Sequence, residues 1–96
     1  MKLDVAHGIA TVTLDRPDKL NAVTPAMASD LVRICRELDA DPACRVVLLS
    51  GSGSRGFCAG TDLNGLAGFE TSWDYRNRVE YSAAIRTMRK PVVAAL

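Results

Sequence analysis

The chain has 96 residues, a mass of 10.3 kDa and a net charge of +1, with 48% hydrophobic and 24% charged residues. These values are typical of one globular domain, exclude a collagenous, coiled-coil or disordered chain, and give no reason to expect nucleic acid as a partner. The longest apolar runs are far shorter than the ~18 residues of a membrane span and no signal peptide opens the chain, so we expect a cytoplasmic protein.

The N-terminal segment predicts a β-hairpin. Apolar residues alternate over residues 3–6 and 9–14, and the pair His7-Gly8 between them is typical of a tight turn. His7 is the single histidine, so a catalytic or metal-binding role would depend on it alone, and we favour the turn. Pro17 and the aspartates around it then end the second strand.

A helix and a strand follow. Thr24-Pro25 is a good helix start, because threonine caps N–H groups and proline at the first helical position loses no hydrogen bond. Apolar residues at helical spacing extend this helix from residue 25 to about residue 39: Met27, Leu31, Ile34 and Leu38. Asp41-Pro42 ends it. The continuous apolar run 45–50 predicts a strand buried on both faces of a parallel or mixed sheet.

The C-terminal third predicts a second helix and a final strand. The helix begins at Ser72 with a spacing like that of a capping box and runs to about Arg89. Arg86, Arg89 and Lys90 fall in its last turns, where we favour a solvated helix end over an anion site. Residues 92–96 predict another buried strand. Since nothing follows to cover it, we expect these residues to belong to a longer protein or to need a partner.

Cysteine usage indicates a reduced protein. Cys35, Cys44 and Cys58 are odd in number and form no CxxC pair. This pattern argues against a disulfide framework and against a zinc site. We therefore interpret the cysteines as free thiols and expect no bound metal.

The glycine-rich stretch 51–63 is the segment that is most informative about binding and catalysis. Three of its glycines match the spacing of a dinucleotide-binding turn, but Phe57-Cys58 continues the loop where a helix, or the lysine of a Walker A loop, is required. As one unit, the stretch supplies a glycine turn, a buried phenylalanine and small residues for close backbone approach. If Asp62 caps a short turn, the N–H of Thr61 points outward and suits a developing oxyanion. A tight loop with a capped turn is the competing interpretation.

Four segments together resemble the enoyl-CoA hydratase/isomerase (crotonase) family. The glycine-rich stretch is similar to the signature of that family, and residues 16–22 (RPDKLNA) look like its RP-x-x-x-NA loop. Residues 46–51 are similar to its buried strand, and residues 90–96 to the strand that enters its second glycine-rich turn. The resemblance covers nearly the whole chain.

The resemblance implies an α/β fold of the ClpP/crotonase type, a spiral of ββα units that is incomplete in this chain. Residues 1–96 would be the N-terminal part of a single such domain. The implied substrate is an acyl-CoA thioester, with coenzyme A as part of the substrate and no separate cofactor, and the implied assembly is a homotrimer or hexamer. The chemistry of the family passes through a thioester enolate that two backbone N–H groups stabilise in an oxyanion hole.

The resemblance also implies site residues. The backbone N–H of Thr61 would be the first oxyanion donor, although a smaller residue is commoner there in the family. The substrate-binding positions would be Lys19, Leu20, Ala22, Ala59, Gly60, Asp62 and Leu63. Backbone groups of this set would lie along the adenine and pantetheine of CoA, with Lys19 near a phosphate.

The second oxyanion donor and the acid/base carboxylates of the family come later in sequence than residue 96. The glutamates Glu37, Glu70 and Glu80 match no catalytic position, and Glu37 is expected on the wet face of the first helix. The resemblance therefore implies the N-terminal portion of an enoyl-CoA hydratase or isomerase, with the 96-residue chain alone inactive. The alternative is a truncated, non-catalytic acyl-CoA-binding or interaction module that docks its open strand on a partner.

Overall fold

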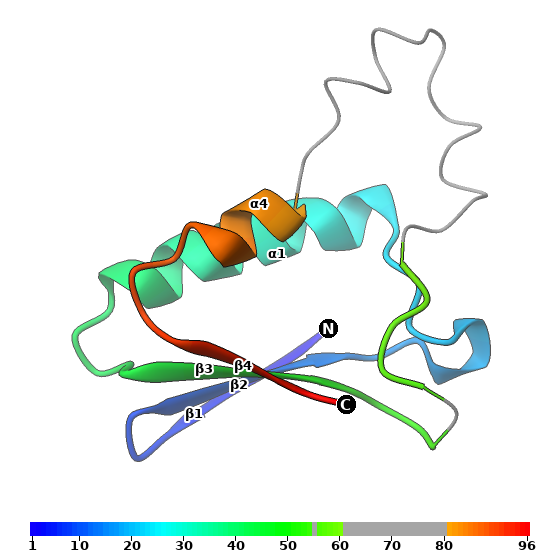
Figure 1. Cartoon of the computed structure of the whole chain (residues 1–96), viewed down its shortest axis with the longest axis horizontal. Coiled ribbons are helices and arrows are strands. Elements are labelled where there is room, and N and C mark those ends of the chain that lie inside the picture. Colours follow the sequence, from blue (N-terminus) through cyan, green and yellow to red (C-terminus); the bar gives the residue numbers. More distant parts are fainter. Residues whose placement is uncertain (55, 61–80) are drawn as a thin grey trace, which may run out of the picture.

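The computed structural model describes residues 1–54, 56–60 and 81–96, which form one sheet with helices over one face (Figure 1). The elements are β1 (Lys2–Ala6), β2 (Ile9–Leu14), the 3-10 helix η1 (Pro17–Lys19), α1 (Pro25–Ala40), β3 (Val46–Gly51), α4 (Tyr81–Arg86) and β4 (Val92–Ala95). The strand order is β1-β2-β3-β4, antiparallel between β1 and β2 and parallel from β2 to β4. The expected α/β arrangement is confirmed for these residues. None of the helices in the described ranges is long and apolar enough to cross a membrane.

The hairpin turn has the geometry that the sequence predicts. His7 and Gly8 both have positive φ, 54° and 81°, as in the two-residue type I′ turn that joins antiparallel strands. The carbonyl of Gly8 also accepts the N–H groups of Arg45 at 2.7 Å and Val46 at 3.2 Å. The turn therefore fixes the start of β3 as well as the register of β1 on β2.

The core lies between α1 and the face of the sheet that it covers. The hydroxyl of Thr24 accepts the N–H of Met27 at 3.2 Å, so threonine caps the helix and proline follows it, as predicted. In β2 every second residue is buried, because alternate residues of a strand point to one face. The apolar stripe of α1 packs on these residues: Met27, Leu31, Ile34 and Leu38 from the helix, and Ala10, Val12, Leu14 and Val47 from the sheet.

The strands β3 and β4 are less buried than the sequence predicts. Val47 is the one buried residue of β3, and Val93 of β4 is 52% exposed. Leu48 pairs with Val93, so both lie on the face opposite to Val47. The prediction of strands buried on both faces is wrong for the described residues, because α1 and α4 lie on the same face of the sheet (Figure 1).

The end of the second helix also differs from the prediction. The helix α4 ends at Arg86 rather than Arg89, and the predicted start at Ser72 lies outside the described residues. Lys90 turns toward α1, where its ammonium group donates to the carbonyls of Leu38, at 2.5 Å, and Asp41. Each of these carbonyls also accepts a backbone N–H, from Asp41 and Cys44, and both lie at the C-terminal end of α1, where a positive charge is stabilising. Lys90 therefore caps α1 and is not part of a solvated end of its own helix.

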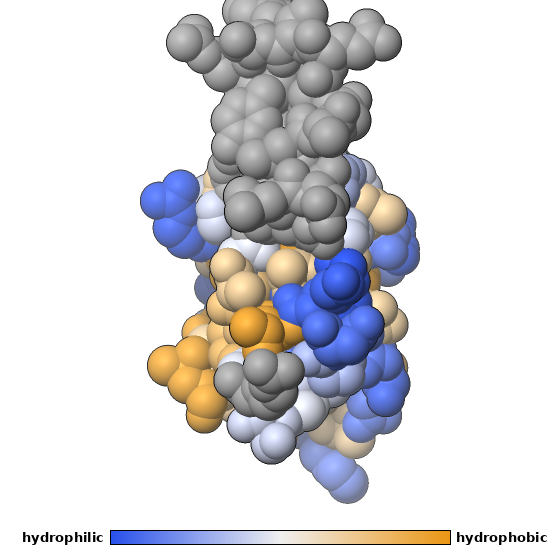
Figure 2. Space-filling model, turned by 90° about the vertical axis from the view of Figure 1, so that its right-hand side faces the viewer, coloured by the Kyte–Doolittle hydropathy of each residue, from blue (hydrophilic) through white to orange (hydrophobic). Residues whose placement is uncertain are grey.

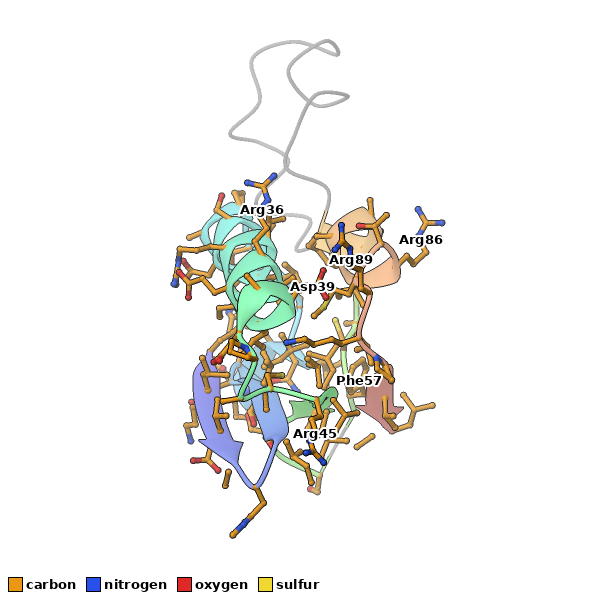
Figure 3. The ribbon with its side chains drawn as sticks, turned by 90° about the vertical axis from the view of Figure 1, so that its left-hand side faces the viewer. Arg36, Asp39, Arg45, Phe57, Arg86 and Arg89 are labelled. Carbon is orange, nitrogen blue, oxygen red and sulfur yellow. The ribbon has the colours of Figure 1, made fainter. Side chains whose placement is uncertain are left out.

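Asp39 makes the reciprocal contact. Its Oδ1 accepts the N–H groups of Arg89 at 3.0 Å and Lys90 at 3.3 Å. Figure 3 shows Asp39 directed from α1 toward the segment that carries Arg89. The lysine and the aspartate together hold the connection between α4 and β4 against the C-terminal end of α1.

Replacing Lys90 tests this capping role. In the natively expressed protein, we expect Lys90→Met to lower the free energy of unfolding by about 2 kcal/mol, because charge-assisted hydrogen bonds are lost while the apolar stem is kept. Arg86→Met, at the exposed end of α4, is the control and should change stability by less than about 0.5 kcal/mol. Urea unfolding measures both, and equal losses would contradict the assignment.

Candidate functional site

Two loops leave the sheet side by side at the carboxyl ends of β2 and β3. These strands end at Leu14 and Gly51, which are partners in the parallel register. The N–H of Ser52 donates to the carbonyl of Leu14 at 2.8 Å, so residues 15–23 and 52–60 start from a common point. Their paths lie together at the right of Figure 1. The carboxyl ends of parallel strands are the edge of an α/β sheet where ligands bind.

Two backbone hydrogen bonds then pair the loops with each other. The N–H of Ala59 donates to the carbonyl of Leu20 at 2.9 Å, and the N–H of Val23 donates to the carbonyl of Gly60 at 2.8 Å. Five of the predicted substrate-binding residues therefore belong to one pair of joined loops: Lys19, Leu20, Ala22, Ala59 and Gly60.

The other predicted site residues are Thr61, Asp62 and Leu63. They lie outside the described residues, which resume at Tyr81. The outward N–H predicted for Thr61 and the cap predicted for Asp62 therefore stay predictions. The described part of the site ends at Gly60, one residue before the expected oxyanion donor.

The first loop contains a sharp, strained turn. Leu20 and Asn21 both have left-handed backbone conformations, with φ of 52° and 56°. This conformation costs a residue other than glycine about 1–3 kcal/mol. The turn closes because the N–H groups of Lys19 and Asn21 both donate to the carbonyl of Arg16, at 3.0 and 2.8 Å. It leaves the leucine side chain 37% exposed, as an apolar contact surface beside the second loop.

Asn21 joins the two loops through its side chain, a role that the sequence analysis missed. The residue is completely buried. Its Oδ1 accepts the N–H of Arg16 at 2.8 Å, and its Nδ2 donates to the carbonyls of Ser52 (2.9 Å), Gly56 (3.2 Å) and Phe57 (3.0 Å). The only signal in the sequence is its place in the RPDKLNA segment, because an asparagine in a loop is ordinarily solvated.

Phe57 corrects a further expectation. The sequence predicts a buried phenylalanine as the anchor of the glycine-rich loop, but Phe57 is half-buried. The part of the residue that is held is its carbonyl group, which accepts from Asn21. The loop is therefore anchored through its main chain and not through an aromatic ring.

The backbone donors at the predicted binding positions already have partners. Main-chain carbonyls within the two loops accept the N–H groups of Lys19, Leu20, Ala22 and Ala59. The N–H of Gly60 donates to the sulfur of Cys58 at 3.4 Å, a weak acceptor, and has no stronger acceptor among the described residues. The carbonyls of Lys19, Leu20, Ala22 and Gly60 also accept hydrogen bonds within the two loops, which leaves each of them a second lone pair. A ligand would therefore meet these partly used acceptors and the exposed side chains of Lys19 and Leu20. Figure 2 looks onto this end of the molecule and shows hydrophobic and hydrophilic side chains next to each other.

Glycine is favoured at position 60 by the backbone conformation there and not by a lack of room for a side chain among the described atoms. Its φ is 94°, in the region that favours glycine. No described atom lies within 4 Å of the position that a Cβ would occupy. No described residue therefore occupies the space beside the main chain of Gly60.

Asp15 and Ser52 link the two loops at their bases. The hydroxyl of Ser52 donates to Oδ1 of Asp15 at 2.8 Å, and the ammonium of Lys2 lies 3.5 Å from Oδ2. The hydroxyl first, and the charge of Lys2 to a smaller degree, hold the pKa of Asp15 below its ordinary value of 3.8.

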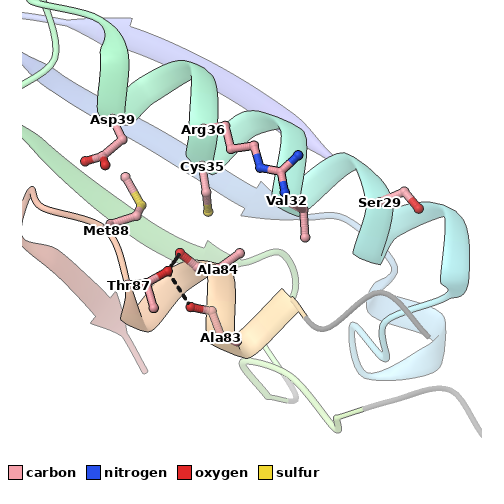
Figure 4. Close-up of a pocket in the computed structure, with 9 residues that line it drawn as sticks. All are labelled: Ser29, Val32, Cys35, Arg36, Asp39, Ala83, Ala84, Thr87 and Met88. Atoms are coloured by element: carbon pink, nitrogen blue, oxygen red, sulfur yellow. Dashed lines mark hydrogen bonds between the residues drawn. The ribbon is translucent and has the colours of Figure 1, made fainter. Parts of the chain in front are cut away.

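A groove between α1 and α4 lies apart from these loops (Figure 4). Its volume is about 590 Å³, and none of the predicted binding residues lines it. Burial, assisted by the charge of Asp39, raises the pKa of the Cys35 thiol on its wall, so the thiol stays protonated and is a poor nucleophile. The carboxylate of Asp39 already accepts two N–H groups. Within the described ranges, no group of three or more potential metal-ligating side chains is present.

Comparison with known proteins assigns the chain to a protein family. The sequence profile of the enoyl-CoA hydratase/isomerase family matches residues 9–96. The chain belongs to this family. The match confirms the resemblance drawn from the four sequence segments.

Relatives within the enoyl-CoA hydratase/isomerase family differ in activity. The chain is 34% identical to "Probable enoyl-CoA hydratase 1, peroxisomal" of Arabidopsis thaliana over 89 residues, which are 93% of this chain and 33% of that protein. It is 43% identical over 60 residues to the 1,2-epoxyphenylacetyl-CoA isomerase of Escherichia coli strain K12, which covers 62% of this chain and 22% of the isomerase. The chain therefore spans a third or less of the length of these relatives.

A solved structure confirms the fold class. The enoyl-CoA hydratase from Bacillus anthracis is similar to this chain with a TM-score of 0.84 and 28% sequence identity. The similarity covers 97% of this chain and 38% of the hydratase. The described sheet and helices are thus a part of the crotonase-type α/β fold.

The link between Asp15 and Ser52 predicts a change in titration. We expect Ser52→Ala to raise the pKa of Asp15 toward 3.8, and Lys2→Met to raise it less, as measured by NMR titration of the carboxyl group. Because the folded pKa is lowered, the stabilisation is present above the ordinary pKa and is lost as pH falls through the folded pKa. An unchanged titration in Ser52→Ala would mean that the hydroxyl does not bind the carboxylate in solution.

Proposed function

We propose that the protein containing these residues is an acyl-CoA thioester enzyme of the enoyl-CoA hydratase/isomerase type. The observation that carries the proposal is the joining of the RPDKLNA loop to the glycine-rich loop at the carboxyl ends of β2 and β3, in a chain of this family. The two relatives described above are named as an enoyl-CoA hydratase and as an isomerase of a CoA thioester. They support the substrate class and leave the choice of reaction open.

The proposed chemistry is stabilisation of a thioester enolate by the N–H of Thr61. The thioester oxygen gains charge only as the enolate forms, so a fixed donor lowers the transition state more than the bound substrate. Gly60 supports this proposal, because its carbonyl belongs to the same peptide group as that N–H. The C=O and N–H of a trans peptide point in opposite directions. Because the carbonyl of Gly60 accepts from Val23, we expect the N–H of this peptide group to point away from Val23 and to be polarised by that hydrogen bond.

CoA is proposed to lie along the joined loops. The N–H groups of Leu20, Ala22 and Ala59 are engaged within the protein, and the carbonyls of Leu20 and Ala22 each accept one hydrogen bond, so the main chain offers CoA the second lone pairs of these oxygens. The adenine amino group and the pantetheine amides are donors that match such acceptors. The exposed ammonium of Lys19 supplies a positive charge for a phosphate.

The acid/base part of the reaction is not assigned to this chain. Glu37 is exposed and pairs with Arg33 at 3.3 Å, which confirms it as a surface charge, while Glu70 and Glu80 lie outside the described residues. We therefore propose that residues 1–96 alone do not turn over. The cytoplasmic location and the homotrimer or hexamer also stay predictions.

A binding or interaction module is the second candidate. It is favoured by β4, the edge strand of the described sheet, whose Val93 is 52% exposed. An exposed apolar edge strand is suited to pairing with another chain. Such a module would bind acyl-CoA or a partner without turnover.

An assay of the natively expressed protein separates these candidates. We expect it to hydrate or isomerise a short-chain enoyl-CoA, followed by the absorbance of the conjugated thioester and by product analysis, and we expect no turnover by a polypeptide of residues 1–96. Binding of the thioester without turnover by the native protein would favour the module. Turnover by residues 1–96 would contradict the proposal that these residues lack the second oxyanion donor and the acid/base carboxylates.

Gly60 offers a test of the binding surface. We expect Gly60→Val to abolish binding of a CoA thioester in the native protein, because valine is strained at a φ of 94° and fills the space beside the main chain. Ala43→Val is the control, since it adds a branched side chain at an exposed position outside both loops. Calorimetric titration gives both affinities, and an unchanged affinity in Gly60→Val would remove Gly60 from the site.

A further inference from the structure

We propose that Asn21 is a positioning residue for the thioester site. It sets the geometry of the glycine-rich loop without touching the substrate. This inference rests on the proposed function and adds to it a residue outside the predicted set of ligand contacts. The evidence is the burial of Asn21, the convergence of carbonyl groups on its amide, and its place between the two backbone hydrogen bonds that join the loops.

Burial keeps Asn21 from contacting a ligand. The residue has no solvent-exposed surface, and both ends of its amide are engaged. Acceptors surround Nδ2 and a donor faces Oδ1, so its hydrogen-bond partners fix the orientation of the amide. Any effect of Asn21 on the reaction must therefore pass through the groups that it holds.

The groups that it holds are three carbonyls of the glycine-rich loop. Those of Ser52, Gly56 and Phe57 all lie within 3.2 Å of Nδ2. Their negative ends converge on one point and repel each other unless a donor lies between them, and a buried carbonyl without a donor is destabilised. The two N–H groups of one amide meet this requirement, so the path of the loop depends on Asn21.

Gly51 closes the space around that amide. A Cβ on Gly51 would lie 2.2 Å from the carbonyl oxygen of Phe57 and 2.7 Å from Nδ2 of Asn21. The loop thus folds back onto the end of β3 with no room for a side chain. Among the described residues, the donor to the three carbonyls comes from the other loop, as the amide of Asn21.

The backbone of Asn21 lies between the two hydrogen bonds that join the loops. Leu20, just before it, accepts from Ala59, and Val23, two residues after it, donates to Gly60. Asparagine tolerates the left-handed conformation seen here, φ 56°, better than other residues that carry a side chain. A shift at this position moves both hydrogen bonds, and with them the carbonyl of Gly60 that orients the proposed oxyanion donor.

Two substitutions separate the amide from the backbone conformation. Asn21→Gly removes the amide and keeps a residue that adopts positive φ freely, whereas Asn21→Asp keeps the shape and places an acceptor against three carbonyls. Ile34→Ala is the control, because it weakens the core without touching either loop. All three variants are made in the natively expressed protein, and kcat is calculated per folded molecule.

We expect both Asn21 variants to lower kcat by about 100-fold, as expected for a displaced oxyanion donor, with KM for the thioester changed less than about 5-fold. In Asn21→Gly, hydrogen exchange should quicken at the amides of Ala59 and Val23 while those of Val12 and Val47 keep their protection. Ile34→Ala should keep kcat within about 2-fold. A purely structural role would instead speed exchange throughout and leave kcat per folded molecule unchanged.

The outcomes distinguish the two proposals. If the wild type is active and Asn21→Gly is as active as Ile34→Ala, the positioning role is overturned and the proposed function stands. A wild type that neither binds nor converts a CoA thioester would overturn the proposed function and the positioning role with it. If the variants do not fold, the side-chain amide hydrogens of Asn21 in the wild type decide: they should exchange as slowly as the amide of Val12, and rapid exchange would overturn the inference.

Discussion

The candidate site depends on one requirement, that three carbonyl groups that converge after the end of β3 need a donor between them. The crowding at Gly51 leaves no room for a side chain at position 51. The donor comes from a segment far away in sequence, as the amide of Asn21. The amide that donates to these converging carbonyls is thus also the contact that joins the two loops.

The same amide offsets the strain of the turn that carries it. Left-handed conformations at Leu20 and Asn21 cost about 2–6 kcal/mol together. The two N–H groups of Nδ2 serve three carbonyls, and Oδ1 accepts one N–H, so the side chain of Asn21 makes the equivalent of three hydrogen bonds. At about 0.5–1.5 kcal/mol each, these offset most of this cost. The turn is therefore stable only together with the glycine-rich loop, and neither loop has this geometry without the other.

The sequence predicts those parts of the fold that neighbouring residues determine. The turn at His7, the cap at Thr24 and the apolar stripe of α1 depend on local spacing and appear as predicted. Lys90 was assigned to the end of its own helix, because the pattern cannot show that α1 ends beside it. The RPDKLNA and glycine-rich segments were identified by resemblance, whereas the bonds of Asn21 needed the folded chain, since its acceptors lie more than 30 positions away.

Core packing and site geometry meet at Val23. This residue is 1% exposed and belongs to the hydrophobic core, yet its N–H orients the carbonyl of Gly60. The next residue, Thr24, caps α1 through Met27 and Ala28, so the position of the helix fixes that of the N–H. At its other end α1 is held by Lys90. Because a packed helix clamped at both ends moves only as a unit, the donor that orients the glycine-rich loop is as rigid as the core itself.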